Sequence, residues 1–175
     1  MGKKISFTLD PVSIDRAIKE LKDYKRDIQR KMNLLRERVA ERIKAEAQSG
    51  FDGAIVDDLT PRSGGVKMAQ VSVTTSEKEN VMIVLASGED AIWVEFGAGV
   101  FHNAPAGASP HPKSGEFGFT IGGFGKGYGN RELWGYYDED GSLRLTHGTP
   151  AAMPMYKALQ SVIRDIPKIA IEVFA

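Results

Sequence analysis

Residues 11–49 predict one long helix, and this prediction constrains the fold more than any other part of the sequence. Apolar side chains recur at intervals of four and three residues, at Ile14, Ile18, Leu21, Ile28, Met32, Leu35 and Val39. That spacing places them along one face of an α-helix. Asp10 and Pro11 suit the N-cap and the first helical turn. Ser49 and Gly50 are typical of a helix end.

The apolar stripe of this helix needs a partner. Lys25 interrupts the stripe, and about four heptads with a lysine in the seam are marginal for a coiled coil. We therefore expect the stripe to pack on the protein's own sheet. A helix of some 35 residues spans roughly 50 Å, which is longer than a small domain is wide. We expect either a break near Tyr24 or a projecting end that needs a neighbouring subunit.

The remaining elements predict an α+β domain that spans residues 1–175. Strand patterns occupy residues 3–9, 66–75, 81–86, 92–96, 133–137 and 142–145, residues 51–65 are expected to form a loop, and a C-terminal helical pattern covers residues 151–174. Residues 66–96 are expected to form a hairpin plus a third strand, and residues 133–145 a second hairpin. Residues 81–86 are continuously apolar, which is typical of a strand covered on both faces. Pro167 should kink or restart the last helix. We predict a small, mostly antiparallel sheet packed by the two helices.

A glycine- and proline-rich segment, residues 97–131, separates the predicted third strand from the second hairpin. Loops of this length are uncommon inside a compact domain and are usually functional. A phosphate-binding loop needs Ser or Thr after its lysine, whereas Lys126 is followed by Gly127. Phe124, Lys126 and Tyr128 alternate with glycines, which favours an arm that docks on a partner.

The composition excludes several classes of protein. Cysteine is absent, which excludes disulfides, cysteine metal sites and thiol catalysis. The sequence has no run of about 18 apolar residues, so we expect no membrane span. His102, His111 and His147 lack metal-ligand spacing and are expected on the surface or in turns. Glu95, close to Trp93, has no second carboxylate near it in the sequence with which it could form a catalytic pair. We therefore expect no catalytic residue, metal or cofactor. A hydrolase that uses Glu95 or the loop histidines is the last of the three functions that we consider.

The net charge of zero conceals an asymmetry along the chain. Residues 1–50 hold 13 Lys and Arg against 8 Asp and Glu. A nucleic-acid-binding protein that uses this basic helix is therefore the alternative interpretation, with phosphate contacts from Arg26, Arg30, Arg38 and Arg42. The acids are interspersed with the bases, which favours an ordinary solvated helix face instead. Specific nucleic-acid binding is not our first expectation.

Three short motifs carry a resemblance to a known family. Residues 60–66 (Thr-Pro-Arg-Ser-Gly-Gly-Val), 94–99 (Val-Glu-Phe-Gly-Ala-Gly) and 150–159 (Pro-Ala-Ala-Met-Pro-Met-Tyr-Lys-Ala-Leu) follow one another around the predicted hairpin and before the last helix. This pattern resembles the tail-completion family of long-tailed phages and prophages, named for gene product ten of a lambda-like coliphage. Ala98 stands where the family more often has Thr, and Met153 where it often has an aromatic residue.

The resemblance implies an α+β virion component at the head–tail junction, without catalytic residues. It implies assembly in the host cytoplasm and a final place in the tail or neck of the virion. The partners would be other copies of the chain, in a ring or another homo-oligomer of the virion, and the tail terminator, tail-tube or head-closure proteins, with no small-molecule substrate and no membrane. Together with the glycines, prolines and aromatic arm, it suggests structural or docking roles for Trp93, Glu95, Phe96, Gly97, Gly99, Phe124, Lys126, Tyr128, Pro150 and Pro154. Removing residues 104–130 is expected to leave a folded monomer that cannot assemble.

Overall fold

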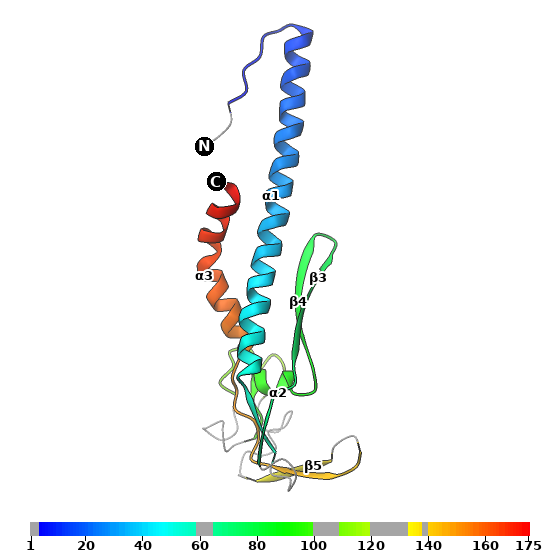
Figure 1. Ribbon diagram of the computed structural model, residues 1–175, viewed down its shortest axis with the longest axis vertical. Coiled ribbons are helices and arrows are strands. Elements are labelled where there is room, and N and C mark those ends of the chain that lie inside the picture. Colours follow the sequence, from blue (N-terminus) through cyan, green and yellow to red (C-terminus); the bar gives the residue numbers. More distant parts are fainter. Residues whose placement is uncertain (1–3, 59–64, 100–108, 120–132, 138–139) are drawn as a thin grey trace.

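The computed structural model is an elongated α+β protein built along one helix (Figure 1). It describes residues 4–58, 65–99, 109–119, 133–137 and 140–175. The elements in chain order are α1 (Pro11–Asp52), β1 (Ile55–Asp58), β2 (Gly65–Met68), β3 (Ser72–Lys78), β4 (Val81–Ser87), α2 (Ala91–Phe96), β5 (Trp134–Tyr137), β6 (Leu143–Thr146) and α3 (Pro154–Phe174). The predicted fold class, a long N-terminal helix and a C-terminal helix packed with antiparallel strands, is confirmed.

Helix α1 is a single uninterrupted helix of 42 residues, which corresponds to a length of about 63 Å. Of the two expected alternatives, a break near Tyr24 is wrong, and the helix instead has a projecting end (Figure 1). Asp10 caps the helix as predicted, because its carboxylate accepts a hydrogen bond from the Ser13 amide at 2.9 Å. The Thr8 hydroxyl and then the Ser13 amide lower the pKa of this exposed carboxyl.

Gly50 does not end α1, which continues to Asp52. A Cβ atom at Gly50 would lie only 2.7 Å from the Cβ atom of Pro154. The glycine is thus explained by the close approach of α1 and α3 rather than by helix termination.

Helix α3 packs antiparallel to α1 and covers only its second half (Figure 1). The start of α3 meets α1 at Gly50, where Pro154 is in contact. Its end meets α1 at Lys31, whose ammonium donates to the carbonyl oxygen of Phe174 at 3.4 Å. Residues 11–30 of α1 consequently extend beyond α3.

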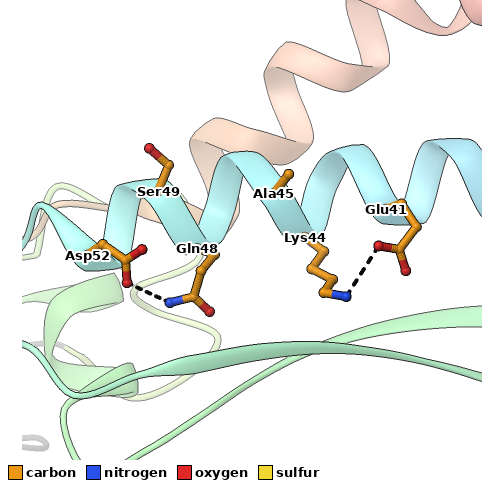
Figure 2. Close-up of a pocket in the computed structure, with 6 residues that line it drawn as sticks. All are labelled: Glu41, Lys44, Ala45, Gln48, Ser49 and Asp52. Atoms are coloured by element: carbon orange, nitrogen blue, oxygen red, sulfur yellow. Dashed lines mark hydrogen bonds and ion pairs between the residues drawn. The ribbon is translucent and has the colours of Figure 1, made fainter.

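The β3–β4 hairpin lies along the opposite side of α1 from α3 (Figure 1). The side chain of Gln48 fixes it there, because this amide accepts from the Val73 amide at 2.7 Å and donates to the Val71 carbonyl at 2.9 Å. Asp52 accepts the second amide hydrogen of Gln48 at 2.7 Å (Figure 2). Further along α1, the Thr75 hydroxyl donates to Glu41 at 2.7 Å. That contact, more than the Lys44 ammonium, lowers the pKa of the exposed Glu41 carboxyl.

In the described residues the strands form three two-stranded antiparallel ribbons rather than one sheet. Strand β1 lies inside the segment predicted as the loop 51–65. The predicted strand 66–75 divides into β2 and β3. Strand β2 ends at Met68, and the Ala69 amide, which donates to the Ala54 carbonyl at 3.1 Å, makes the last hydrogen bond in line with the β1–β2 pairing. The second predicted hairpin is present as β5 and β6.

Three further predictions need correction. Residues 4–9 form no strand, since no neighbouring strand pairs with them, and Leu9 is almost fully exposed. Residues 91–96 form the short helix α2 instead of a third strand, because alternation over five residues also fits one and a half helical turns.

Helix α3 begins at Pro154 rather than at residue 151 and continues through the exposed Pro167, so the expected restart is wrong. Contacts of Ile169 and Val173 on its buried face hold the helix beyond that proline.

The core lies where the end of α1, the ribbons and α2 converge. Its buried members are Ala47, Phe51, Ala54, Val56, Val73, Val94 and Ala158. They come from α1, β1, β3, α2 and α3, except Ala54, which lies between α1 and β1. This convergence places the C-terminal end of α2 directly beside the start of α3.

We predict that Gln48→Ala lowers the free energy of unfolding by about 1–3 kcal/mol, because the Val73 amide and the Val71 carbonyl each lose a half-buried partner. Chemical denaturation followed by circular dichroism measures this. Gln29→Ala makes the same chemical change at an exposed position of the same helix and should change stability by less than about 0.5 kcal/mol. Equal effects of the two variants would contradict the role of Gln48.

Candidate functional site around Glu95

The two motifs around residues 94–99 and 146–154 form one structural unit. Ala98 and Thr149 make an antiparallel bridge, in which each amide donates to the other residue's carbonyl at 2.8 and 3.0 Å. The Val94 carbonyl accepts from the Ala152 amide at 2.9 Å. Segments that lie some fifty residues apart in the sequence thus share one hydrogen-bonded junction at the base of α1.

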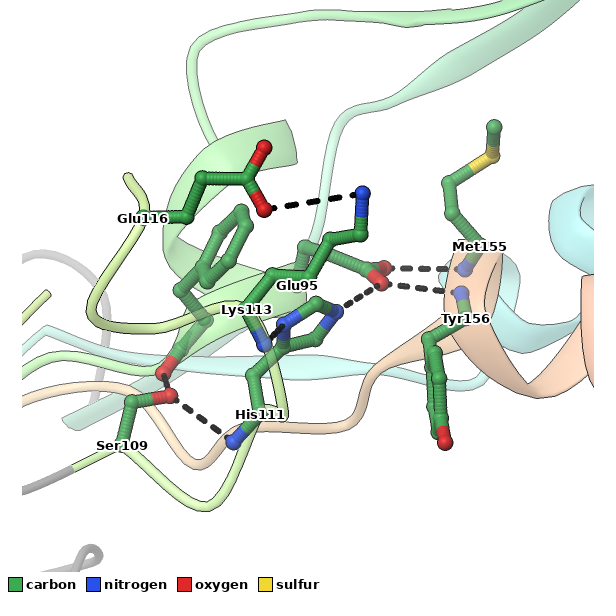
Figure 3. A network of polar contacts seen from close by, with 8 residues as sticks. Glu95, Ser109, His111, Lys113, Glu116, Met155 and Tyr156 are labelled. Carbon is green, nitrogen blue, oxygen red and sulfur yellow. Dashed lines mark hydrogen bonds and ion pairs between the residues drawn. The ribbon is translucent and has the colours of Figure 1, made fainter. Parts of the chain in front are cut away.

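Glu95 provides the N-terminal cap of α3 from a different element. Its two carboxylate oxygens accept from the Met155 amide at 2.8 Å and the Tyr156 amide at 2.9 Å (Figure 3). Helix α3 has no side-chain cap of its own at Met153, and Pro154 has no amide to satisfy. Glu95 therefore satisfies the two free donors of the first turn and adds a negative charge beside the positive end of the helix dipole.

His111 completes the surroundings of Glu95. Its Nε2 lies 3.2 Å from a Glu95 oxygen, and its Nδ1 accepts from the Lys113 amide at 3.1 Å. This pattern assigns the proton of a neutral ring to Nε2, which donates to Glu95. The ring lies in a turn, as expected, but it is only 5% exposed, so the expectation of a surface histidine does not hold for His111.

Phe96 is the centre of an aromatic cluster next to this carboxylate. Its ring stacks on Phe119 at 4.4 Å between centroids and contacts the His111 ring at 4.3 Å. Trp93 meets Phe119 edge-on at 6.0 Å. Phe119 is fully buried. The burial of Phe119 and His111 contradicts the expectation that residues 104–130 are dispensable for folding.

A tight glycine turn brings the second motif against the first. Gly97 and Gly99 both have a φ of 74°, as their predicted role in sharp turns requires. Gly148 has a φ of 104°, and a Cβ atom there would collide with the Ala98 carbonyl oxygen. Only glycine fits that position, because both the backbone conformation and the space exclude a side chain.

A second buried carboxylate anchors the strand that leads into this turn. Asp57 of β1 accepts from the His147 amide at 2.8 Å and lies 2.9 Å from His147 Nδ1. The Thr146 hydroxyl donates to the Asp57 carbonyl at 2.8 Å. These contacts attach β6 to β1, so that residues 146–154 run directly from the second hairpin into α3.

The geometry around Glu95 is that of a structural junction. Glu95 and His111 are buried and hydrogen-bonded to one another. The Ser109 hydroxyl donates to the Phe96 carbonyl and accepts from the His111 backbone amide at 3.2 Å, while both imidazole nitrogens of His111 have other partners. A nucleophile needs a base within hydrogen-bond reach, and these three side chains do not provide that arrangement. Within the described residues, no group of three His, Asp or Glu side chains is arranged to hold a metal ion.

A cleft of about 350 Å³ lies on α1 (Figure 2). It is lined by Glu41, Lys44, Ala45, Gln48, Ser49 and Asp52. Lys44 pairs with Glu41 at 3.2 Å, and Gln48 with Asp52 at 2.7 Å. Because these groups bind one another or the hairpin, the cleft presents little unsatisfied chemistry to a ligand.

The structure brings together six of the ten predicted structural residues, namely Trp93, Glu95, Phe96, Gly97, Gly99 and Pro154, and Pro150 follows directly on the Ala98–Thr149 bridge. Phe124, Lys126 and Tyr128 lie outside the described residues. Sequence reasoning missed the positions of His111, Ser109 and Phe119. The two prolines that flank His111 in the sequence could have indicated its position, because they favour a fixed turn over a free loop.

The four arginines of the nucleic-acid interpretation each lie beside a carboxylate. Arg30 pairs with Asp27 at 2.9 Å, and this arginine is the main cause of a lowered Asp27 pKa. The others form the pairs Arg26–Asp23, Arg38–Glu172, Arg42–Glu46 and Arg42–Asp165. Phosphate binding would have to displace these carboxylates, which weakens the electrostatic basis of that interpretation.

In comparisons with protein families, with curated proteins and with solved structures, no match to this chain was found. In the described part of the chain, no helix is both long and apolar enough to cross a membrane.

We predict that Glu95→Gln lowers the free energy of unfolding by about 1–3 kcal/mol, because the amide replaces one acceptor oxygen by a donor that faces other donors. Urea denaturation measures the change. Glu116→Gln removes an exposed carboxylate whose pair with Lys113 is 3.7 Å long, and it should cost less than about 0.5 kcal/mol. A Glu95 variant as stable as this control would contradict the capping role.

We also predict that Gly148→Ala destabilises the protein by about 3 kcal/mol or more, because it combines a strained backbone with a collision at the Ala98 carbonyl. Gly115→Ala is the matched control, since a Cβ atom there meets nothing within 4 Å. Differential scanning calorimetry of both variants would show the difference. Similar melting temperatures would mean that the Ala98–Thr149 junction is not as close as described.

Proposed function

We propose that this protein is a structural assembly protein of a tailed phage or prophage, which completes the tail and joins it to the head. It acts by docking against other copies of itself and against tail terminator, tail-tube or head-closure proteins. It assembles in the host cytoplasm and then belongs to the tail or neck of the virion. Catalysis is not part of the proposal.

The observation that carries the proposal is the bare first half of α1. Because α3 ends at Lys31, the roughly 20 residues before it extend about 30 Å beyond α3. Residues 4–10 run back beside this part of the helix (Figure 1). The Thr8 amide donates to the Ser13 hydroxyl at 3.0 Å, and Ser13 and Ala17 are buried. The apolar stripe next to that side remains uncovered.

The uncovered stripe continues a seam that is covered only in part along the rest of α1, where Met32 is still 45% exposed. Ile14, Ile18 and Leu21 are 36, 43 and 55% exposed, whereas Leu35 and Val39 of the same seam are partly buried where α3 lies. A helix that projects an apolar seam into solvent gains stability by docking on another helix or sheet. An assembly component offers such a partner, and a lone enzyme domain has no evident use for the extension.

The specific place in the virion comes from the motif resemblance. Two of its motifs, residues 94–99 and 150–159, form the junction that sets the direction of α3 against α1. Their function here is architectural, which agrees with a family that the resemblance describes as non-catalytic. The third motif, residues 60–66, lies mostly outside the described residues.

The test is complementation of a phage or prophage from which this gene is deleted, scored by infectious titre and by electron microscopy. The wild-type gene should restore joined virions, whereas Ile18→Gln combined with Leu21→Gln should lower the titre at least about tenfold, as expected for a loss of about 1.4 kcal/mol or more of docking free energy. Filled heads beside unjoined tails are the expected images.

Val12→Gln is the control, because Val12 is 75% exposed and lies on the face of α1 opposite Leu21. It should restore the titre fully. Normal virions produced by the deletion strain itself would overturn the proposed function. Equal titres for the seam variant and the control would remove the projecting helix from the docking mechanism.

A further inference from the structure

We propose that the projecting part of α1, residues 11–30, takes as its partner one acidic amphipathic helix of a different protein. In this interface the apolar face of the partner covers Ile14, Ile18 and Leu21, and a carboxylate of the partner pairs with Lys25. Which virion protein supplies that helix rests on the assembly role proposed above, whereas the chemistry of the surface can be measured on the isolated chain.

Lys25 lies inside the apolar seam of α1. The seam positions follow one another at intervals of four and three residues, and Lys25 stands four residues after Leu21 and three before Ile28. Its side chain is exposed, and the seam on either side of it is exposed as well, by 55% at Leu21 and 45% at Met32. A partner that covers this seam must therefore also cover the ammonium of Lys25. Because burying a charge without a counter-charge is strongly unfavourable, the partner must bring a carboxylate to this position.

The cations of the projecting part outnumber the acids available to pair with them. Residues 11–30 hold six Lys and Arg against four Asp and Glu. Two of the cations form ion pairs within the helix, which are Arg26–Asp23 and Arg30–Asp27. In the described part of the chain, no ion pair or hydrogen bond engages the side chains of the other four, which are Arg16, Lys19, Lys22 and Lys25. This part of α1 thus presents unneutralised positive charge beside its apolar seam.

Two of these free cations, Lys22 and Lys25, lie on the side of the helix that the partner would meet. At about 100° per residue, Lys22 stands about 60° from Lys25 around the helix axis, at the edge of the seam, whereas Arg16 lies directly opposite Lys25. The acid closest to this side is Asp15, which is about 15 Å from Lys25 along the axis and therefore beyond ion-pair distance. A helix docked on the seam meets both lysines together.

The contact between α1 and α3 shows what kind of element covers this helix. The buried apolar face of α3 lies on the second half of α1, and two acids of α3 meet cations of α1. Asp165 pairs with Arg42, and Glu172 lies 3.9 Å from Arg38. The projecting part begins where this contact ends, at Lys31. An acidic amphipathic helix placed end to end with α3 would continue the same combination of apolar contact and ion pairing along α1.

The exposed seam also sets the length of the partner and disfavours a second copy of the same surface. From Ile14 to Met32 the helix rises about 27 Å, which corresponds to about five turns of a partner helix. A parallel pair of projecting helices would place Lys25 against Lys25. In an antiparallel pair centred on the seam, Lys22 and Lys25 of both copies would meet at its middle. Like charges that face one another across an interface suppress such pairing.

The test uses a synthetic helical peptide of about 20 residues as the probe. The acidic peptide has Leu at its seam positions, Glu at one central seam position and Glu along both edges of the apolar face. The basic peptide carries Lys in place of every Glu. Fluorescence anisotropy measures the affinity of each peptide for the full chain at near-physiological ionic strength. We expect the wild-type chain to bind the acidic peptide at least about tenfold more tightly than the basic one.

Three variants of the full chain locate the effect. Lys25→Glu should reduce the preference for the acidic peptide at least about tenfold. Arg16→Glu makes the same change of charge on the opposite face of the same helix and should reduce the preference less than about threefold. Leu21→Gln should weaken the binding of the acidic peptide about tenfold, because it removes apolar contact. Circular dichroism melts check that these variants, all at exposed positions, remain folded.

Several results would overturn the proposal. They are no binding of either peptide, equal affinity of the wild-type chain for both peptides, unchanged affinity in Leu21→Gln, and equal effects of Lys25→Glu and Arg16→Glu. Vesicles of phosphatidylglycerol and duplex DNA, measured in the same salt, represent other anionic partners. Tighter binding of either one than of the acidic peptide, lost in Lys25→Glu, would assign the surface to that partner instead. An oligomeric mass by light scattering that falls in Leu21→Gln would assign it to a second copy of the chain.

The outcomes separate this surface from the proposed function. Failure of the peptide measurements overturns the acidic partner, even if deletion of the gene still blocks head–tail joining. Normal virions from the deletion strain overturn the assembly role, while charge-dependent peptide binding by the same chain would retain the surface.

Discussion

The carboxylate of Glu95 is the contact on which the arrangement of the two long helices depends. It reaches from α2 to the first turn of α3 and accepts the two amides that this turn cannot satisfy itself. Helix α3 begins with a proline after a residue without a capping side chain, so its start is defined by a tertiary contact. The neutral His111 ring and the phenylalanine cluster hold Glu95 away from water, which strengthens its hydrogen bonds to the helix. Through this junction the end of α2 determines where α3 starts and which part of α1 it covers.

The other elements attach to helix α1, and this arrangement leaves apolar surface exposed to solvent. A closed sandwich or barrel covers its apolar faces within one chain. Here the β3–β4 hairpin and α3 each use one face on α1 and leave the other face bare, and the first half of α1 extends beyond both. The proposed docking of the projecting helix would cover part of this surface. It describes a subunit whose stability is divided between its own core and its neighbours.

Local patterns in the sequence were sufficient for the long helices and the hairpins. The heptad spacing, Asp10 and Pro11 predicted α1, and the strand patterns at residues 133–137 and 142–145 predicted the β5–β6 hairpin. The errors occurred where a residue has two physical uses. Gly50 suits a helix end, but here it allows α3 to approach. The alternation from Ile92 to Phe96 suits a strand, but a short helix aims Glu95 at α3 and Val94 at the core.

The sequence by itself determined the class of fold, the start of α1 and the importance of the two motifs at residues 94–99 and 150–159, because periodicity, capping residues and glycine turns act over a few neighbouring positions. Only the tertiary structure decided that these motifs bind one another, that His111 and Phe119 belong to the same core, and that α3 stops at Lys31. Those contacts join residues far apart in the chain, and no local pattern encodes which distant donor a buried carboxylate will meet. Among the described residues, these contacts leave the apolar side chains of Ile14, Ile18 and Leu21 in the first half of α1 exposed.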